Sequence, residues 1–468
     1  MLEDFIIGRI KAELPFEPNE EKAGLFAALG AFLVSHEARK AFILRGYAGT
    51  GKTSVVSALV RAFAGLKQEC VLLAPTGRAA KVLSKYSGTQ AYTIHKKIYR
   101  QNQLGVEAFS LTDNRHKKTL FIVDEASMLS GNRDNGTFGS GCLLDDLVQY
   151  VYSGEGCSLL LLGDDAQLPP VGSLNSPALD ADYMAQYGLQ VRSYTLRQVA
   201  RQALDSGILS EATRIRLGIE DSRLKIEDLS IRANGIDIIR LPGEEVIETL
   251  ENSRREVGAE ETLIIARSNK LTNMYNQGVR TRVLWKEDAI SNGDRLMVSK
   301  NNYFWTQDYE GLEFLANGDM LEILRLTNVH EMYGFQFAKA TLRSLDYDWE
   351  IEALLWLDTL TTENPEANYA LQNELFARVA EDFPEIRNRK ELVKAVYESP
   401  YYNALQIRFA YAVTCHKAQG GQWKHVYVDT SGIGEDKERM SDGTERREFL
   451  RWLYTAMTRA TEKIYVLR

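Results

Sequence analysis

The sequence has few cysteines and histidines and contains no long hydrophobic run. Its four cysteines form no CxxC pair and its six histidines show no ligand spacing, which argues against a disulfide framework or a metal site built on them. No apolar run approaches the roughly 20 residues of a membrane-spanning helix. The first residues carry acids where a secretion signal carries basic charge. These absences predict a protein of the reducing cytoplasm without a membrane anchor.

Positive charge is in deficit as well, since 64 acidic residues outnumber 56 lysines and arginines and give a net charge of −8. A nucleic-acid binder uses Lys and Arg to neutralise phosphates, so this balance counts mildly against one. It does not exclude one, because a protein can hold a strand in a local groove whatever its global charge. The length of 468 residues suits two to four globular domains.

Short apolar runs alternate with helical stretches in the first part of the chain. We expect Asn19 to cap a leading helix. The runs predicted as strands are 41–44, 70–74, 120–123 and 159–162. Continuous apolar strands separated by helices indicate a parallel sheet that is covered on both faces and binds ligands at the carboxyl ends of its strands.

A second α/β part is expected from about Val191. Its predicted strands are 262–266, 426–428 and 463–467. Between about 285 and 400 the turn sequences Gly293-Asp294 and Asn317-Gly318-Asp319 lie among short β-like segments such as 295–298, and a Glu-rich helical stretch follows. We interpret 285–400 as a small insertion that splits the second α/β domain.

The segment Gly46–Thr53 matches the P-loop pattern G-x-x-x-x-G-K-[ST] between a predicted strand and a predicted helix. Its glycines let backbone N–H groups surround a phosphate, Lys52 can neutralise the β- and γ-oxygens, and Thr53 can bind Mg²⁺. The residues expected to hold the nucleotide here are Gly46, Ala48, Gly49, Thr50, Gly51, Lys52, Thr53 and Ser54.

Two other strand ends carry polar groups that suit phosphoryl chemistry. The run 120–123 delivers Asp124, which can hold the shell of the Mg²⁺ ion, and Glu125, which can polarise an attacking water. The run 159–162 leads to Gln167, whose amide can bond the γ-phosphate or the water. An isolated pair of acids or a Pro-containing loop is often only a solvated strand end, so these assignments depend on the P-loop beside them.

Taken in order, these segments resemble the superfamily 1 helicases, specifically the RecD/Dda-like group. The motifs that carry the resemblance are Gly46–Thr53, Ala74–Ala80, Thr93–His95, Asp124–Ser127, Gly163–Pro170, Val199–Gln202, Thr414–Gly420 and Tyr454–Ala460. They span nearly the whole chain, and their joint order makes the resemblance specific.

The resemblance implies an α/β fold with two RecA-like P-loop motor domains built on parallel sheets, and a small SH3-like β-barrel inserted in the second. The implied ranges are 1–190 for the first domain with a short wedge or pin at about 101–118, 191–284 and 401–468 for the second, and 285–400 for the barrel with a helical extension. Phe109 is the apolar candidate for the tip of the pin. Tyr303, Phe304 and Trp305 could stack on bases, although such a cluster is more often core.

The resemblance further implies that ATP and Mg²⁺ are bound. Arg201 and Arg459 look like the two arginines that reach across the cleft between motor domains to the γ-phosphate, where a guanidinium binds bidentately and stays charged. With Lys52, Glu125 and Gln167 they form the expected catalytic set.

A second group of residues looks like the loops that hold the nucleic-acid strand. Its members are Pro75, Thr76, Gly77, Arg78, Thr93, His95, Thr414, His416 and Lys417. Hydroxyls, backbone amides and single cations contact phosphates without reading sequence, which suits a motor that steps along any strand. Taken singly, His95 and His416 fit a structural role equally well.

Glu21 marks one departure from the family pattern. The group carries a glutamine before the P-loop that recognises adenine, and Glu21 stands where this glutamine is expected. A carboxylate can accept a hydrogen bond from the adenine amine, but unless it is protonated it cannot donate one to the ring nitrogen. We therefore expect Glu21 at the nucleotide site with a relaxed choice of base.

The resemblance implies an ATP-dependent DNA helicase that moves 5′→3′ on single-stranded DNA and opens a duplex fork. It also implies a monomeric cytoplasmic motor with replication or repair proteins as partners. An ATP-driven single-strand translocase, or a remodeller that displaces RNA or protein without unwinding duplex, remains open. A nucleotide-binding scaffold with dormant chemistry is disfavoured because the catalytic set is complete.

Overall fold

The computed structural model describes residues 2–101, 109–133, 139–199, 206–220, 230–309, 312, 314–363, 365–431 and 443–467. The chain divides into two compact units. The first comprises Met1–Ile239, Gln419–Gln422 and Gly432–Ile464, and the second comprises Arg240–Ala418, Trp423–Ser431 and Tyr465–Arg468.

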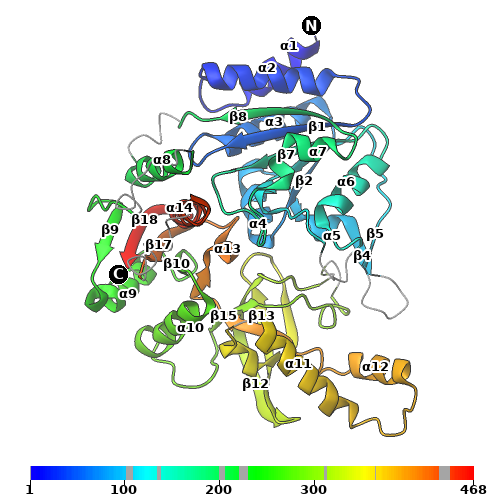
Figure 1. Ribbon diagram of the computed structural model, residues 1–468, viewed down its shortest axis with the longest axis vertical. Coiled ribbons are helices and arrows are strands. Elements are labelled where there is room, and N and C mark those ends of the chain that lie inside the picture. The colour runs from blue at the N-terminus through cyan, green and yellow to red at the C-terminus, as the bar shows by residue number, and fades with distance from the viewer. Residues whose placement is uncertain are drawn as a thin grey trace. The chain divides into compact units, whose positions relative to one another are not determined.

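A six-stranded parallel sheet lies in the first unit, with strand order β3-β2-β6-β7-β1-β8. Its strands are β1 (Lys40–Gly46), β2 (Cys70–Ala74), β3 (Ala91–Thr93), β6 (Leu120–Val123), β7 (Ser158–Gly163) and β8 (Gln190–Leu196). The helices of this part are α1 (Leu2–Ala12), α2 (Glu20–Val34), α3 (Lys52–Leu66), α4 (Gly77–Ser87), α5 (Ile94–Ile98), α6 (Leu143–Ser153), α7 (Ala181–Ala185) and α8 (Gly207–Glu220), as Figure 1 shows. The four predicted strands and the helix cap at Asn19 are confirmed.

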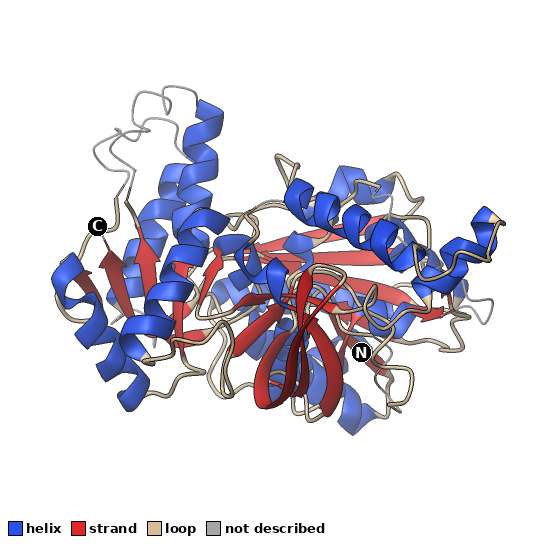
Figure 2. Ribbon diagram, turned by 90° about the horizontal axis from the view of Figure 1, so that it is seen from below, coloured by secondary structure: helices blue, strands red, loops and turns tan. Residues whose placement is uncertain are grey.

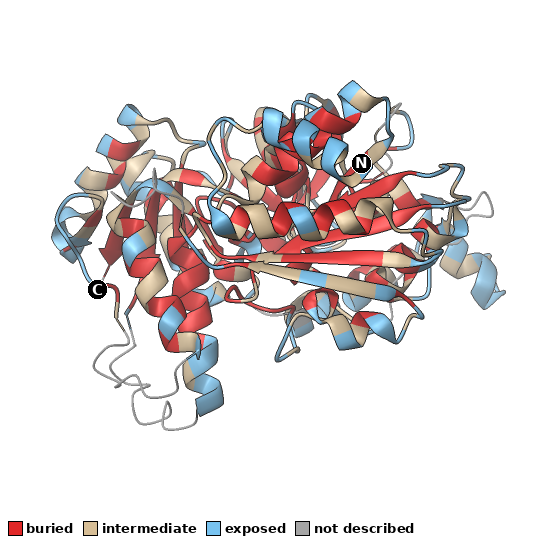
Figure 3. Ribbon diagram, turned by 90° about the horizontal axis from the view of Figure 1, so that it is seen from above, coloured by how far each residue is buried: buried red, intermediate tan, exposed pale blue. Residues whose placement is uncertain are grey.

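Helices cover both faces of this sheet. Alternate residues of a strand point to opposite faces, so Leu120 and Ile122 of β6 join the core that contains residues of α2, α3 and α4. Phe121, between them, points the other way and packs edge-on against Tyr150 of α6. In Figure 3 the strands are mostly red, for buried, while pale blue exposed residues lie along the helices. The continuous apolar runs therefore reflect burial on two sides.

The expected domain boundary at Val191 is wrong. Residues 190–196 form β8, which pairs in parallel with β1 of the first sheet, with Val191 opposite Ala41. This strand lies at the edge of the sheet and is mostly half-buried, so its sequence lacks the continuous apolar run that marks the inner strands.

The second sheet has five strands in the order β16-β10-β17-β18-β9. They are β9 (Ile238–Leu241), β10 (Thr262–Ala266), β16 (Ala412–Thr414), β17 (Trp423–Asp429) and β18 (Ala460–Leu467). The nearby helices in sequence are α9 (Val246–Glu256), α10 (Asn269–Gly278), α13 (Cys415–Ala418) and α14 (Gly443–Met457). Strand β10 runs parallel to both β16 and β17, and the predicted strands at 262–266, 426–428 and 463–467 are confirmed.

A closed β-barrel in the second unit confirms the predicted insertion. Its strands are β11 (Arg295–Val298), β12 (Met320–Met332), β13 (Phe335–Ser344), β14 (Glu350–Trp356) and β15 (Leu405–Phe409), and Figure 2 shows them curling around one another. The expected end at residue 400 is too early, because β15 closes the barrel by pairing with β11 and β14. Helices α11 (Pro365–Ala380) and α12 (Arg389–Tyr397) pack Leu375 and Val396 into a core with Trp356 of the barrel.

Trp305 belongs to this same core. It packs against the cluster around Phe337 and Trp356, and its indole Nε1 donates a hydrogen bond to the Asn403 carbonyl at 2.8 Å. Of the two roles considered for the aromatic group 303–305, the core role therefore describes Trp305.

A small antiparallel pair, β4 (Tyr99–Gln101) and β5 (Phe109–Leu111), occupies part of the range expected for the pin. Phe109 is only 4% exposed and pairs with Gln101, so it is a buried strand residue and the expectation that it forms the tip is wrong. Residues 102–108, between the two strands, lie outside the described part of the chain.

Within the described residues, no helix combines the length and apolar character that crossing a membrane requires.

Candidate nucleotide site

The P-loop connects the end of β1 to the start of α3. Gly49 and Gly51 adopt positive φ angles of 75° and 90°, in the left-handed region that glycine enters without steric cost. Gly51 is the N-cap residue of α3, so the first turn of that helix opens directly from the loop. The Thr50 hydroxyl is buried and donates to the Tyr47 carbonyl at 2.8 Å, which tightens the loop from inside. Free N–H groups at a helix start, within a glycine loop, suit a phosphate.

Lys52 is the first residue of α3, and Thr53 and Ser54 follow it in the first turn. The Lys52 ammonium folds back and donates to the carbonyls of Gly46 and Tyr47, the second at 3.2 Å. Both acceptors are neutral carbonyls of the same loop. A phosphate bearing full charge is a stronger partner for an ammonium than a carbonyl is, so Lys52 can exchange these bonds for bonds to a nucleotide.

Three carboxyl groups lie at the carboxyl ends of β6 and β7. Burial raises the pKa values of Asp124 and Glu125, and the positive charge of Lys52 opposes both shifts. Burial also raises the pKa of Asp164 to about 6, against the opposing effects of Lys52 and a hydrogen bond from Tyr454. A carboxylate with a raised pKa is a stronger base than an exposed one, which suits proton abstraction near neutral pH.

Arg459 supplies the cation next to Glu125. Its guanidinium Nη1 lies 4.0 Å from Glu125 Oε1, and the side chain is almost fully buried. Further bonds run from Nε to the Thr455 carbonyl at 3.1 Å and from Nη1 to the Gly421 carbonyl at 3.1 Å. These neutral acceptors fix the guanidinium in place, so its charge is directed at Glu125 and lowers the pKa of that carboxyl against the effect of burial.

Gln167 lies in the turn that follows β7. Its side chain is 6% exposed, and its amide Oε1 has no hydrogen-bond partner within the described structure. The backbone holds the residue in position, since Gln167 N–H donates to the Asp164 carbonyl at 3.2 Å. A buried amide oxygen is a strong hydrogen-bond acceptor, so this one can accept from a water or another polar ligand.

Tyr454 is a site residue that sequence reasoning did not single out, although it begins the quoted motif 454–460. Its hydroxyl accepts the Ala48 N–H of the P-loop at 2.8 Å and donates to Asp164 Oδ2 at 2.7 Å. The Ala48 amide, expected to face the nucleotide, is therefore directed at a phenol. Nothing in local sequence marks this contact, because its partners lie 406 and 290 positions away along the chain.

The residues expected to hold Mg²⁺ are chemically suited to it. Asp124 offers a half-buried carboxylate and Thr53 a hydroxyl at the start of α3, and both are hard oxygen donors. No group of three or more His, Cys, Asp or Glu gathers as a metal cage in the described part of the chain. Mg²⁺ commonly binds through one or two protein oxygens completed by substrate phosphates and water, so such a cage is not needed.

Glu21 plays a role that the sequence did not predict. Its two carboxylate oxygens accept the N–H groups of Arg197 and Gln198, at 2.7 and 3.0 Å. Both oxygens are thus bonded to the backbone just after β8, so the carboxylate anchors that segment to α2. Lys22, the next residue, is almost fully buried, and its Cε lies 3.3 Å from where a Cβ on Gly51 would stand.

The strand-binding candidates of the first unit lie at neighbouring strand ends, since β2 and β3 pair in parallel with Ala74 opposite Thr93. Pro75 and Gly77 flank Thr76, whose hydroxyl caps α4 by accepting the Ala79 N–H, and Thr93 caps α5 in the same way through Lys96. Both threonines therefore position the first turn of a helix, where free N–H groups point outward.

The basic candidates differ in their hydrogen-bond partners and in whether they carry a positive charge at physiological pH. Arg78 donates from Nη2 to the Gln422 carbonyl at 3.2 Å. Burial lowers the pKa of His95 to about 4, so its imidazole is neutral at physiological pH and cannot act as a cation. Burial and the charge of Lys417 lower the pKa of His416 as well.

The candidates of the second unit follow β16. Thr414 ends that strand, and His416 and Lys417 lie in the short helix α13. Lys417 is exposed, and its ammonium donates to Asn317 Oδ1 at 2.7 Å in the turn before β12. The structure therefore brings the candidates together as two sets, one in each unit. Arg201 lies outside the described residues.

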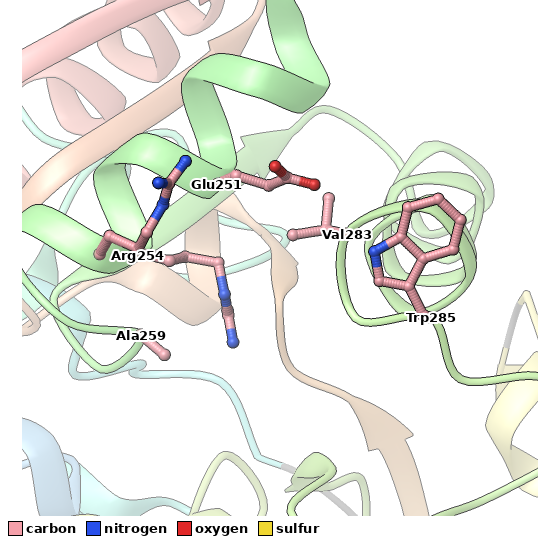
Figure 4. Close-up of a pocket in the computed structure, with 6 residues that line it drawn as sticks. Glu251, Arg254, Ala259, Val283 and Trp285 are labelled. Carbon is pink, nitrogen blue, oxygen red and sulfur yellow. The ribbon is translucent and has the colours of Figure 1, made fainter.

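A pocket of about 390 Å³ lies elsewhere in the second unit. It is lined by Glu251, Arg254, Arg255, Ala259, Val283 and Trp285. Figure 4 shows Val283 between the carboxylate of Glu251 and the indole of Trp285. Ala259 precedes β10 while Thr414 pairs with the last residue of that strand, so the pocket lies at the opposite strand end from the predicted strand-binding loop.

Comparisons with known proteins agree with this geometry. Residues 27–230 match the family model described as an AAA domain, and residues 409–467 match that of the UvrD-like helicase C-terminal domain. The first match contains the P-loop, Glu125 and Gln167, and the second contains Tyr454 and Arg459.

Several curated relatives share this chain's sequence at low identity. An uncharacterized protein of Acanthamoeba polyphaga mimivirus is 22% identical over 92% of this chain and 96% of its own length. The ATP-dependent RecD2 DNA helicase of Deinococcus radiodurans is 26% identical over 61% of this chain and 37% of its own. The ATP-dependent DNA helicase dda of Enterobacteria phage T4 is 28% identical over 37% of each chain. The chain thus spans little more than a third of these two helicases.

Among solved structures, one of Pif1 helicases at forked double-stranded DNA aligns with a TM-score of 0.47 at 14% identity, over 96% of this chain and 92% of the other. A Bacteroides Pif1 in complex with ADP-AlF3 and single-stranded DNA aligns over the same shares, with a TM-score of 0.45 at 14% identity.

Proposed function

We propose that this chain is a superfamily 1 helicase of the RecD/Dda-like group, and that it hydrolyses ATP to move 5′→3′ along single-stranded DNA and to separate duplex strands. One observation carries the proposal. Arg459, from the segment that matches a helicase C-terminal domain, lies 4.0 Å from Glu125, at the strand end beside the P-loop of the other match. A nucleotide-driven motor needs a cation that a distant segment brings to the catalytic carboxylate, because such a cation links hydrolysis to the position of that segment.

The side chains divide the hydrolysis of ATP among them. The first turn of α3 offers N–H groups to the phosphates, and Lys52 leaves the carbonyls of Gly46 and Tyr47 to neutralise the β- and γ-oxygens. Glu125, whose pKa burial raises, accepts a proton from the attacking water. Gln167 orients that water through its unpaired Oε1.

Charge on the transferred phosphoryl group is stabilised by the arginines. Arg459 exchanges its partner Glu125 for the γ-phosphate, which also releases the carboxylate to act as a base. We assign the same stabilising role to Arg201 by the family resemblance. Asp124 and Thr53 are the residues that would hold Mg²⁺, which would supply further neutralisation of phosphate charge. Lys52, Glu125 and Arg459 lie in one compact unit, so one copy of the chain supplies all three.

The strand is held by the two sets of loops, one after β2 and β3 and one after β16. Their hydroxyl, amide and cationic groups contact phosphates without reading bases, as translocation requires. We take the 5′→3′ direction from the family resemblance of the motifs, and the opening of duplex from the similarity to proteins named as DNA helicases.

Duplexes with either a 5′ or a 3′ single-stranded tail test the proposal. We expect ATP-dependent unwinding only of the 5′-tailed duplex, and no hydrolysis by the Lys52→Ala variant, because positioning and charge neutralisation supply most of the catalysis. Unwinding only from the 3′ tail would overturn the direction. Strand-stimulated hydrolysis without unwinding of either substrate would instead indicate a translocase, or a remodeller that displaces RNA or protein.

A further inference from the structure

Tyr454 connects two parts of the nucleotide site that are far apart in sequence. Its phenol oxygen has one proton, and the Ala48 N–H on one side can only donate to it. That proton must therefore point to Asp164 Oδ2, at 2.7 Å, which fixes the direction of both hydrogen bonds. The Tyr454 side chain is 1% exposed, so water does not compete for either bond.

Asp164 carries this connection onward to the turn that holds Gln167. Its second oxygen, Oδ1, accepts the Ala166 N–H at 3.0 Å, and its backbone carbonyl accepts the Gln167 N–H at 3.2 Å. A continuous chain of hydrogen bonds thus runs from the P-loop through Tyr454 to the residue that faces the attacking water.

Neighbours of Tyr454 hold the same turn from the other side. Leu168 N–H donates to the Thr455 hydroxyl at 2.9 Å, and the Leu168 carbonyl accepts the Gln419 amide at 2.8 Å. Both backbone groups of Leu168 are therefore bonded to side chains, one from Gln419–Gln422 and one from Gly432–Ile464 of the first unit. Such a turn takes its position from those side chains.

We propose that Tyr454 is a positioning residue that sets the place of Gln167 relative to the P-loop, and that it controls the rate of the hydrolysis step rather than the affinity for nucleotide. The inference deepens the proposed function, since the reaction it concerns is ATP hydrolysis by that site. Catalysis depends steeply on placement, and a displacement of about 1 Å can cost up to ~10²-fold in rate. Tyr454 holds one P-loop amide, that of Ala48, whereas we expect nucleotide affinity to depend mainly on the first turn of α3 and on Lys52, whose ammonium bonds Gly46 and Tyr47.

The Tyr454→Phe variant of the full chain tests this role, because it removes the hydroxyl and keeps the ring. With a saturating single-stranded oligonucleotide, we expect kcat for ATP hydrolysis to fall by about tenfold while KM for ATP stays within about twofold. Calorimetric binding of ADP is expected to match the wild type, which also shows that the variant is folded.

Tyr427→Phe is the matched control. Tyr427 is also buried, and its hydroxyl shares a 2.7 Å hydrogen bond with Ser253 in the second unit. We expect this variant to keep the wild-type kcat while its thermal midpoint changes about as much as that of Tyr454→Phe. A second test adds Asp164→Asn to Tyr454→Phe, where we expect the combined loss in kcat to be smaller than the product of the single losses.

Several results would overturn the inference while leaving the proposed function intact. Wild-type kcat in Tyr454→Phe would do so, as would a raised KM with unchanged kcat, or an equal loss of kcat in the control. Fully multiplicative losses in the double variant would show that Tyr454 does not act through Asp164. Absence of hydrolysis by the wild-type chain itself would count against the proposed function instead.

Discussion

At the scale of single residues, two backbone amides decide the chemistry of Glu21. The N–H groups of Arg197 and Gln198 both point at its side chain, and only a carboxylate offers an acceptor oxygen to each. A glutamine at this position would set its NH2 group against one of these donors. The departure from the family pattern is therefore a structural requirement of the segment after β8.

Glu21→Gln is accordingly expected to lower stability rather than to restore a family feature. We expect a loss of about 1 kcal/mol in the free energy of unfolding, because one hydrogen bond to a charged acceptor is lost and one amide is left facing a donor. Chemical denaturation followed by circular dichroism measures the change. A variant as stable as the wild type, with a sharpened preference for ATP over other nucleotides, would show that Glu21 faces the base after all.

Asp164 makes stability depend on pH. Its pKa is about 6 in the folded protein against 3.8 for an ordinary aspartate, so between these values the folded state holds a proton that the unfolded state lacks. The bound proton stabilises the folded state fully below pH ~4. As the pH rises towards and past about 6 the proton is released, and the free energy of unfolding falls by roughly 3 kcal/mol in all.

The Asp164→Asn variant removes this titration. We expect its free energy of unfolding, relative to that of the wild type, to increase as the pH rises from 4 to 6, since only the wild type must release the buried proton. Denaturation curves for both proteins at several pH values without nucleotide give the difference. Parallel pH dependences would contradict the assignment.

At the scale of elements, continuous apolar runs were enough to predict the inner strands, because a strand buried on both faces has no polar positions. The edge strand β8 was missed for the opposite reason, since its half-buried face gives no such run. The P-loop and the acids after β6 could be predicted because each is contiguous in sequence. Tyr454 could not be, because its role comes from a side chain that reaches residues hundreds of positions away.

Asp294 was expected only as a turn residue, but its carboxylate is the centre of a buried network of hydrogen bonds and ion pairs. It is fully buried and accepts from Arg280, Lys286, Ser291 N–H and the Tyr411 hydroxyl, with Arg280 itself only 2% exposed. These bonds join the π-helical turn Val279–Val283 and β11 to the segment before β16. The sequence Gly293-Asp294 predicted only a turn, because the partners of the carboxylate come from three other segments.

Asp294→Asn keeps the shape of the side chain and removes its charge. We expect a loss of about 3–5 kcal/mol in the free energy of unfolding, because the Arg280 guanidinium is left buried without a counter-ion. Glu398→Gln is the matched control, since Glu398 forms an exposed pair with Lys394 at 3.9 Å that contributes at most about 0.5 kcal/mol. Equal losses in the two variants would mean that the buried ion pair is not what stabilises this region.

At the scale of the whole molecule, a net charge of −8 has to be reconciled with a strand of phosphates. General attraction to the protein surface is unfavourable, so under the proposed function binding would depend on the few cations and N–H groups that follow β2, β3 and β16. Each such cation then accounts for a measurable part of the slope of log K for DNA binding against log salt. This differs from a basic protein, where many weak contacts share the effect.

Lys417→Ala tests this view of the molecule. Lys417 is exposed at the end of the second sheet, so we expect weaker binding of single-stranded DNA and a salt dependence, as log K against log salt, that is shallower by about 0.7, the value for one phosphate contact. Lys394→Ala changes the net charge equally on α12 and should leave both affinity and slope unchanged. If both variants lost affinity equally, DNA binding would depend on the net charge of the protein, and this would contradict the hypothesis that local cations bind the strand. A change confined to Lys417→Ala would mean that one cation, placed by a strand end, outweighs the repulsion of an acidic chain.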